Sequence, residues 1–599
     1  MHHPGSFFCG RTLRHLGAAA FLALLLHAAP VCAAQPPPDE TVIVTANTSP
    51  VPFENLSRAV TVFTRDDIKN LPARSIPDIL AMAASVDLRS RSPFGTQSDL
   101  SIRGSAFSQV LVMVDGVRIN DSQTAHHNSD FPVQLQDVER IEVLLGPGSS
   151  IYGADAFGGI VNIITRRDAE RVRGSVSGGQ SGFVEGSFSA GFDKGSWRQS
   201  ISVTGNRSSG FQYDRDFRNI AVSARTRIGN ASSFFVSHVN KEFGANGFYG
   251  PSPSREWTNQ TFLSYEHAGR TALFQGYFRT HGDRFLYDTR SPDGFLSSHR
   301  TQSAGALVKS RWSLSKTARL TLGGELGADW IASSNLGDHA YARTSLFAEL
   351  EWLLGRTAIY PGLRFDGYTN FGTAATPSLS ASWWVSPRVR IRSSAGRAFR
   401  IPTFTELYYH DPNHQASDAL TPESAWSAEA GTDWIPAKDW MASVTLFSRR
   451  EQNVIDWIRL YPDDKWRTHN IRNLRTAGAE VSLERPLGPD AGVSARYSRI
   501  SVDPGSVGYT SKYVLDYARD SGSASVFFPL PMRVKYRQTL NYKRRSDGRS
   551  YWLLDGCLER DFRQFTAGIE FTNLLDTQYQ EVLGVDMPGR WFVLTFRTR

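Results

Sequence analysis

The sequence predicts a membrane β-barrel that follows a small domain of mixed α and β structure. The main observation is a hydrophobic period of two, which places apolar and polar side chains on opposite faces of a strand. The pattern recurs from about residue 168 onward without a clear linker, whereas a sandwich domain has roughly 100 residues. Aromatic residues also gather at segment ends, as in Trp383–Trp384, Tyr408–Tyr409 and Trp591–Phe592, which suits interfacial girdles. A set of soluble β-domains is the alternative, because alternation alone does not separate a lipid-facing surface from a packed core.

Residues 1–34 have the features of a secretory signal peptide. Arg11 and Arg14 precede a mostly apolar run over Leu16–Ala29, and small residues follow the run. The run is shorter than the roughly 20 residues that a membrane helix requires. We therefore expect cleavage near residue 34 and export of the mature chain. An uncleaved N-terminal anchor is the alternative.

A β-strand is predicted soon after the export signal, in DETVIVTANTSP at Asp39–Pro50. All the residues of Thr41–Thr45 are β-branched, and this side-chain type favours an extended backbone. QPPP precedes the segment, and Pro50 and Pro52 follow it closely. Because proline interrupts sheet pairing, the strand has no obvious partner in its own chain. Either another protein pairs with it, or it packs on the domain that follows.

Residues 57–167 mix helix and strand signals and predict a compact α+β domain. Thr64 is a good N-cap for a helix whose first turn carries Asp66 and Asp67. Ser75 precedes a second helix start that has proline in its first turn. VLVMVDG at Val110–Gly116 is almost continuously apolar, which predicts a strand buried on both faces and ended by a tight Asp–Gly turn.

Alternation is clear in several later segments. In TSLFAELEW, residues 344–352, Leu346 and Trp352 share one face, while Glu349 and Glu351 lie on the other. Similar patterns occur in WMASVTLFSRR at 440–450, RVKYRQTLNYK at 533–543 and FTAGIEF at 565–571.

Composition and motifs exclude several classes of protein. Only 3 cysteines are present, and two of them fall in the signal, so Cys557 has no partner for an intrachain disulfide. The net charge of +8 is small for 599 residues and is spread along the chain, so we expect no nucleic-acid partner. Zinc-type Cys/His spacing, a phosphate-binding Gly-Lys-Ser/Thr loop and a nucleophile elbow are absent from the sequence. We therefore expect no catalytic residues and no enzyme.

Motifs in residues 57–167 resemble the plug domain of TonB-dependent outer-membrane receptors. They are SIRG (Ser101–Gly104), VLVMVDGVRIN (Val110–Asn120) and VERIEVLLGPGSSIYGADAFGGIVNIIT (Val138–Thr165). The likeness continues along the predicted barrel in GRAFRIPTFTELYY (Gly396–Tyr409), LTPESAWSAEAG (Leu420–Gly431), NVIDW (Asn453–Trp457), TAGAEV (Thr476–Val481) and FTNLLDTQYQEVLGVDMPGRWF (Phe571–Phe592). The resemblance implies a 22-stranded antiparallel transmembrane β-barrel with an N-terminal plug inside it.

The resemblance also implies an arrangement along the chain. It places a signal peptide at 1–34, a periplasmic segment at 35–56, the plug at 57–167 and the barrel at 168–599. The orphan strand then looks like a TonB box, through which the TonB–ExbB–ExbD complex of the inner membrane would drive import. Its TonB-binding residues would be Glu40, Thr41, Val42, Ile43, Val44, Thr45 and Ala46. We expect a monomer in the lipid of the outer membrane of a Gram-negative bacterium.

Within this family, the chain looks most like receptors for cobalamin, and the import of a corrinoid is the favoured function. Receptors for ferric siderophores or haem share the plug motifs and are the alternatives. A receptor that mainly signals or docks phage is a further alternative, but only a short segment precedes the predicted box. We expect no covalent cofactor; the transported metal chelate would carry cobalt or iron.

Candidate ligand-binding residues lie on the expected plug apices, Ser92–Ser98 and Asn120–Asp130, and on one barrel loop. They are Ser92, Phe94, Gln97, His126, His127, Tyr408, Tyr409 and His410. Imidazole commonly binds metal-containing ligands, and tyrosine rings can stack on flat ones. Exposed polar loops are the simpler interpretation of the same histidines.

Several residues depart from the family pattern. Leu145 stands where the family has an arginine that helps to hold the plug, so one plug–barrel ion pair is in doubt. ASDALTPE replaces the usual loop motif NPNLKPE, and the chain ends in FRTR, which moves the last aromatic residue to Phe596. The early loops offer mainly Asp214 and Asp216, which is too few carboxylates to predict a calcium site.

Overall fold

The computed structural model describes residues 43–44, 47, 51–52, 55–168, 172–291, 293–437, 440–471, 473–488, 490–505 and 508–598. The predicted signal peptide and most of the predicted TonB box, residues 40–42 and 45–46, lie outside these residues.

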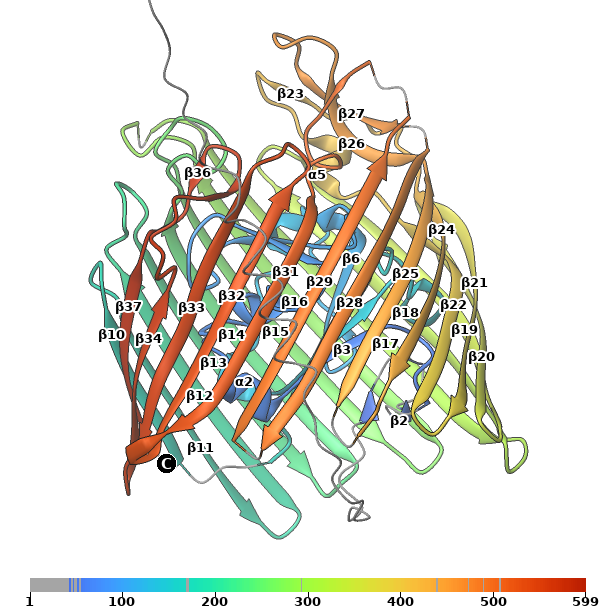
Figure 1. Cartoon of the computed structure of the whole chain (residues 1–599). Helices are drawn as coiled ribbons and strands as arrows, with labels where there is room; N and C mark the ends of the chain where they lie inside the picture. The colour runs from blue at the N-terminus through green and yellow to red at the C-terminus, as the bar shows by residue number, and fades with distance from the viewer. Residues whose placement is uncertain are drawn as a thin grey trace, which may run out of the picture. The chain divides into compact units, whose positions relative to one another are not determined.

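In this described part, 22 antiparallel strands form a closed barrel, as the resemblance implies. β10 pairs with both β11 and the last strand β37, and this pairing closes the wall (Figure 1). The strands of the wall are β10 (Val172–Gly179), β11 (Val184–Lys194), β12 (Trp197–Ser208), β13 (Phe217–Ile228), β14 (Ser232–Gly244), β15 (Arg255–Ala268), β16 (Ala272–Leu286), β17 (Leu296–Ser313), β18 (Ala318–Ser333), β19 (His339–Leu354), β20 (Thr357–Tyr368), β21 (Gly372–Ser386), β22 (Val389–Arg400), β24 (Glu423–Trp434), β25 (Met441–Gln452), β28 (Leu474–Gly488), β29 (Ala491–Asp503), β31 (Ala518–Leu530), β32 (Val534–Arg545), β33 (Ser550–Asp561), β34 (Phe565–Thr572) and β37 (Trp591–Thr598).

The alternation in these strands separates an apolar outer surface from a polar inner surface. In β19, Leu346 and Trp352 are exposed, whereas Glu349 and Glu351 are buried. Exposed apolar side chains and buried charges are the reverse of a soluble core, and they are expected of a wall that faces lipid outside and a filled lumen inside. The soluble β-domain alternative is therefore wrong. Among the described residues, no helix is both long and apolar enough to cross a membrane.

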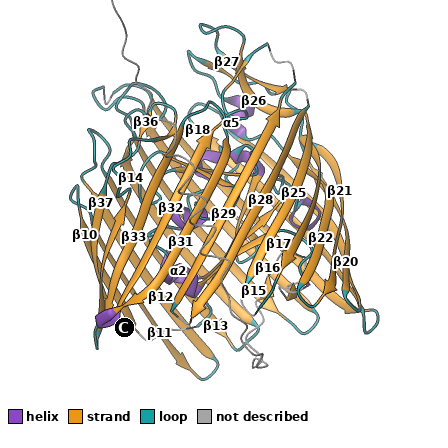
Figure 2. Cartoon of the chain, viewed as in Figure 1, coloured by secondary structure: helices purple, strands orange, loops and turns teal. Residues whose placement is uncertain are grey.

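The plug fills the lumen, and Figure 2 shows helices inside a wall made of strands. Its main sheet has the order β3-β8-β9-β6-β7, and β4 and β5 form a separate hairpin. The plug elements are β3 (Val60–Thr64), α2 (Arg65–Asn70), α3 (Ile76–Leu80), β4 (Val86–Ser90), β5 (Ser98–Ile102), η2 (Phe107–Gln109), β6 (Val110–Val114), β7 (Val117–Arg118), η3 (Ala125–His127), η4 (Leu135–Asp137), β8 (Val138–Leu145), α4 (Ser149–Tyr152) and β9 (Gly159–Thr165).

Local signals in the plug sequence form the predicted elements. Thr64 and Ser75 cap α2 and α3, and each helix has a reciprocal capping box with Asp67 or Asp78. All of β6 is buried, and Asp115 and Gly116 follow it with φ angles of 51° and 80°. Positive φ at both positions fits the tight turn that connects β6 to β7.

A buried ion-pair network anchors the plug to the wall. Arg103, which follows β5, donates from Nη1 to Glu429 on β24 (2.6 Å) and from Nη2 to Glu480 on β28 (2.7 Å). Glu429 also accepts the backbone N–H of Ala59 (3.1 Å). The substitution at Leu145 therefore does not leave Glu429 without a cation, and Leu145 itself packs in the apolar core of the plug.

A second anchor joins the β4–β5 hairpin to strand β32. Asp87 lies 3.1 Å from Lys543 Nζ and 3.4 Å from Arg545 Nη1. Burial alone would raise the pKa of Asp87, but these two cations lower it well below its usual range. The carboxylate therefore stays ionised at any physiological pH.

The two ends of the barrel differ in their connections. Short turns join the strands at one end, which we call the turn end, and longer segments join them at the other, the loop end. The C-terminus and β2 lie toward the turn end in Figure 1. The loop end carries α5 (Phe404–Tyr408), a sheet of β23 (His414–Gln415), β26 (Val454–Arg459), β27 (Trp466–Ile471) and β30 (Thr510–Ser511), and a pair of β35 (Gln580–Val582) and β36 (Val585–Asp586).

The first described residues form a short pair of strands, which corrects one expectation. β1 (Ile43–Val44) pairs with β2 (Val51–Pro52), so this part of the predicted TonB box does have a partner in its own chain. Proline lacks an N–H group but keeps its carbonyl oxygen, and Pro52 stands at the end of a ladder of only two residue pairs. β1 does not pair with the barrel wall.

Replacing Arg103 with leucine should destabilise the folded receptor, because Glu429 and Glu480 would stay buried without their cation. Removing one partner of a buried ion pair costs about 3–5 kcal/mol. Thermal unfolding of the purified protein in detergent measures the effect as a lower Tm. Arg290→Leu is the matched control, since the Arg290–Asp288 pair is exposed and its loss should leave the Tm nearly unchanged. Equal Tm values for the two variants would contradict the anchoring role.

Candidate functional site

The first predicted apex of the plug is largely enclosed by the barrel. Ser92 and Gln97 are buried, and the Gln97 amide donates to the Tyr249 hydroxyl. Phe94 is half-buried and stacks on Phe183 with ring centroids 4.4 Å apart. It also contacts Trp591. These side chains pack in the receptor and present little surface to a ligand in this state.

His126 and His127 have different surroundings although they are adjacent in η3. His126 is partly exposed, stacks on Phe107 at 4.5 Å, and places its Nδ1 2.7 Å from Asp99. Burial lowers the pKa of His126 more than the Asp99 carboxylate raises it. The imidazole is therefore neutral at pH 7 and can contact a ligand at its exposed edge.

His127 is buried in the plug–barrel interface. Its Nδ1 lies 3.2 Å from Asp130 and its Nε2 lies 3.4 Å from Asp283 on β16. Burial alone would lower the pKa of His127, but the nearby carboxylates of Asp283 and Asp130 raise it well above its ordinary value. A ligand that arrives from the loop end cannot reach this side chain without a rearrangement.

The predicted barrel-loop residues lie around α5. The ring of Tyr408 stacks on His339 with centroids 3.6 Å apart, and His410 is exposed. The Tyr409 hydroxyl donates to Asp411 (3.0 Å), and its ring contacts Trp457 at 6.3 Å.

A group of aromatic and cationic side chains connects the plug histidine to the barrel loops. We call it the loop-end aromatic cluster, and its members are His126, Tyr409, His414, Trp457, Trp466, Lys512 and Tyr513. Tyr513 lies 5.7 Å from the His126 ring, and Lys512 Nζ lies 5.2 Å from the Tyr513 ring. His414 accepts from Lys512 Nζ at 2.8 Å. Burial and this cation lower the pKa of His414, so Lys512 carries the positive charge.

From this cluster, sequence reasoning selected His126 and Tyr409 as candidate ligand-binding residues and considered His414 beside them. Trp457 and Trp466 belong to the loop between β25 and β28, and Lys512 and Tyr513 belong to the loop between β29 and β31, so only the folded barrel brings the two pairs together. The tryptophan and tyrosine residues of these two loops were a usable signal, because such residues are enriched where proteins bind ligands. Partly exposed aromatic rings beside a cation can bind a ligand that has both a flat surface and an anionic group.

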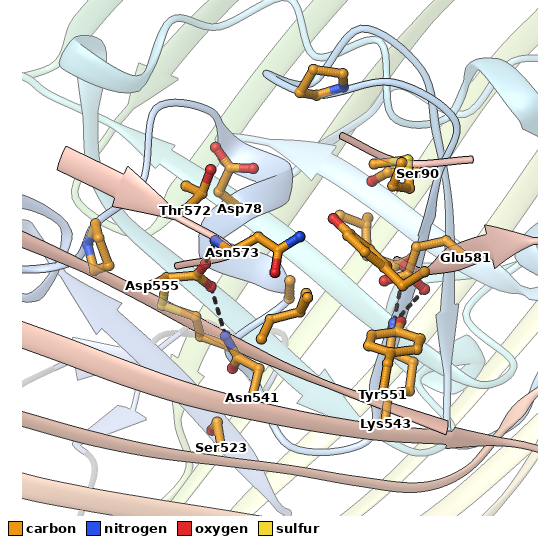
Figure 3. A pocket seen from close by; sticks show the side chains of 18 of the residues that line it. Asp78, Ser90, Ser523, Asn541, Lys543, Tyr551, Asp555, Thr572, Asn573 and Glu581 are labelled. Carbon is orange, nitrogen blue, oxygen red and sulfur yellow. Dashed lines mark hydrogen bonds and ion pairs between the residues drawn. The ribbon is translucent and has the colours of Figure 1, made fainter. Parts of the chain in front are cut away.

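The spaces between plug and wall are too small for a bulky ligand. Figure 3 shows one, lined by Asp78 of α3 and by Asn541, Lys543, Asp555 and Glu581 of the barrel. Its volume is about 210 Å³, and a second space beside β10–β14 has about 370 Å³. Small-molecule sites usually need about 300–1,000 Å³, and a corrinoid or siderophore chelate is at the large end or beyond. Passage of such a ligand therefore requires the plug to rearrange.

Comparisons with known proteins agree with this architecture. Residues 52–160 match the family described as the TonB-dependent receptor plug domain, and residues 165–574 match the TonB-dependent receptor-like β-barrel. The vitamin B12 transporter BtuB of Photobacterium profundum is 26% identical over 504 residues, which cover 78% of this chain and 79% of the relative.

Solved structures of receptors have the same fold. The siderophore receptor PirA from Pseudomonas aeruginosa superposes with a TM-score of 0.71 at 20% identity, and covers 90% of this chain and 98% of its own. The FrpB iron transporter from Neisseria meningitidis superposes with a TM-score of 0.73 at 13% identity, and the match covers 91% of this chain and 99% of the transporter. Identities this low establish the shared fold alone. Taken with the family matches over both plug and barrel, they show that this chain belongs to the TonB-dependent receptors of the Gram-negative outer membrane, which are TonB-driven importers of ligands and not enzymes.

Proposed function

We propose that the imported ligand is a corrinoid such as cobalamin. The observation that carries this proposal is the likeness to the vitamin B12 transporter, because it extends over 504 residues and covers most of both proteins. The solved siderophore receptor PirA and the iron transporter FrpB are less similar in sequence to this chain, so they have less weight in the choice of ligand.

The loop-end aromatic cluster supports the proposal chemically. A corrinoid presents a flat macrocycle, an aromatic base and one phosphodiester group. Partly exposed aromatic rings such as Tyr513 and Trp466 suit the flat parts, and Lys512 suits the phosphodiester. His126 provides a neutral imidazole at the plug side of the same surface.

A ferric siderophore is the second candidate. Lys512 lies over Trp466, and Arg459 lies 4.5 Å from the same ring, so the loops near this cluster hold two cations beside an aromatic face. Many ferric chelates are anionic, and this charge would favour them. Haem is less well supported, because within the described residues no direct contact joins His126 to His410 or His414, and His414 Nε2 already accepts from Lys512.

TonB would act on the segment Glu40–Ala46. β1 is an edge strand of a two-stranded sheet, so a strand of TonB could add to its outer edge or take the place of β2. Backbone hydrogen bonds would hold the two strands together, and a force applied to the segment would be transmitted along the chain to the plug. A structural hairpin at this position, with TonB bound elsewhere, is the competing interpretation.

Replacing Tyr513 with alanine should weaken binding of cyanocobalamin about two- to tenfold, since an aromatic contact is worth roughly 0.5–1.5 kcal/mol. Quenching of tryptophan fluorescence in the purified receptor measures the Kd. Tyr461→Ala is the matched control, because Tyr461 is an exposed tyrosine in the same group of loops. The same titration with ferric enterobactin and haemin identifies the ligand class. Tight binding of ferric enterobactin without binding of cyanocobalamin would favour the second candidate.

Replacing Ile43 with proline should abolish uptake and leave surface binding intact, because proline removes a backbone donor from the paired strand. Uptake and binding of radiolabelled cyanocobalamin are measured separately in a receptor-deletion strain. Ser49→Ala lies outside the predicted box and keeps every backbone donor of the box, so it should transport normally. Unchanged uptake by the proline variant would show that TonB does not pair with this strand.

A further inference from the structure

A buried cluster of histidines and carboxylates joins the plug to the barrel wall. We call it the plug–wall histidine cluster. His127 and Asp130 belong to the plug, His281 and Asp283 to β16, and Glu256 to β15. All five side chains are buried. Because these residues come from three separate segments, the folded plug and barrel are both needed to bring them together.

The atoms of three residues are already spaced as metal ligands are. Asp130 Oδ2 lies 3.2 Å from His127 Nδ1 and 3.1 Å from His281 Nε2. In a tetrahedral site with bonds of about 2.0–2.1 Å, neighbouring ligand atoms are roughly 3.3 Å apart. The ligand atoms of the three residues all lie within 4.8 Å of one another. A small movement would let one ion enter between them.

The second nitrogen of each histidine faces a further carboxylate. His281 Nδ1 lies 3.2 Å from Asp121 but makes no hydrogen bond within the described residues, so a small ring rotation is needed to form one; His127 Nε2 lies 3.4 Å from Asp283. In metal sites, a ligating histidine usually donates its other N–H to such a group, which fixes the orientation of the ring and raises its basicity. Both histidines therefore have the surroundings of metal ligands as well as the spacing.

The cluster also holds more carboxylates than cations, and a bound metal ion would compensate the difference in charge. Its four buried carboxylates are those of Asp121, Asp130, Glu256 and Asp283. The two buried cations beside them are Lys241 and Arg279. Within the described residues, Asp283 Oδ1 is buried and has no hydrogen-bond partner. Buried charge needs compensation, so either protons on the imidazoles or carboxyls or one divalent ion must supply it.

We propose that the plug–wall histidine cluster binds one divalent transition-metal ion of the zinc class, with His127, Asp130 and His281 as ligands. Two imidazoles and a carboxylate suit Zn²⁺, whereas Mg²⁺ and Ca²⁺ prefer oxygen ligands alone. The ion links η3 and Asp130 of the plug to strand β16 of the wall, so it fastens the apex of the plug inside the barrel. This site is separate from the loop-end aromatic cluster, and its existence does not depend on which ligand is imported.

Metal binding is tested on the purified full-length receptor in detergent, prepared with an affinity tag that contains no histidine. After dialysis against chelator and then against Zn²⁺, metal analysis should find one zinc ion per chain beyond the background. Co²⁺ should give the visible absorption of a tetrahedral nitrogen and oxygen site. Zn²⁺ should raise the Tm, since a ligand that binds only the folded state stabilises it, and Mg²⁺ should not.

Two variants identify the ligands. His281→Gln should lose the bound zinc, and Asp121→Asn, which keeps all three ligands, should weaken zinc binding about 10–100-fold. The second variant keeps the test valid if the first does not fold. His238→Gln is the matched control, because His238 is an exposed histidine on β14, and it should bind zinc as the wild type does. Absence of bound zinc in the wild type, or equal binding in the wild type and Asp121→Asn, would overturn the proposal and leave protons as the compensating charge.

Discussion

The closed wall imposes the constraint on which the rest of the structure depends. A barrel of 22 strands has a lumen too wide for its own side chains to fill, so a second domain must occupy it. The inner face of the wall is polar, because the apolar residues of each strand face outward. The plug therefore contacts a charged surface, and it is held by ion pairs such as Arg103 with Glu429 and Glu480. An interface of this kind can separate and be hydrated again, whereas an apolar interface would resist exposure to water.

The β4–β5 hairpin connects the loop end to these anchors. Asp99 near the start of β5 contacts His126 of the loop-end aromatic cluster, and Arg103 lies directly after the end of the same strand. Asp87 on β4 binds Lys543 and Arg545 of the wall. A ligand that contacts His126 thus acts on a strand whose other end holds the plug in place. The structure supplies a continuous physical connection between the outer surface and the anchor.

Local sequence signals predicted the helices and strands of the plug. Contacts between residues that are far apart in the sequence could not be predicted in this way. The caps of α2 and α3 were predictable because Thr64 and Ser75 each accept a hydrogen bond from a backbone N–H only three residues further along the chain. The partners of Arg103 lie on strands more than 300 residues further along, and nothing near Arg103 specifies them. The pairing of β1 with β2 was missed because proline was taken as a barrier, although its carbonyl oxygen can still accept. His127 was expected to face a ligand, yet its position beside strand β16 depends on how the plug turns inside the wall.

The order of contacts along the chain determines which contacts a pull on the predicted TonB box would load first. After the predicted box, Asn47 donates to Glu349 of the wall (3.1 Å), and the Asn55 carbonyl oxygen accepts from the Tyr360 hydroxyl of the wall (3.2 Å). Ser57, Arg58 and Ala59 make the contacts that follow. Ser57 bonds Ser380 of the wall (2.7 Å), and Arg58 bonds the Pro147 carbonyl oxygen of the plug (2.6 Å). The N–H of Ala59 bonds Glu429, the same carboxylate that binds Arg103. Tension on the segment therefore reaches the anchor before it reaches the plug sheet, because β3 begins only at Val60. Loss of the Ala59 bond would free one lone pair of Glu429 and admit water beside Arg103, and in water an ion pair is weak. A pull on the predicted TonB box would in this way loosen a buried anchor of the plug before it unfolds the plug sheet.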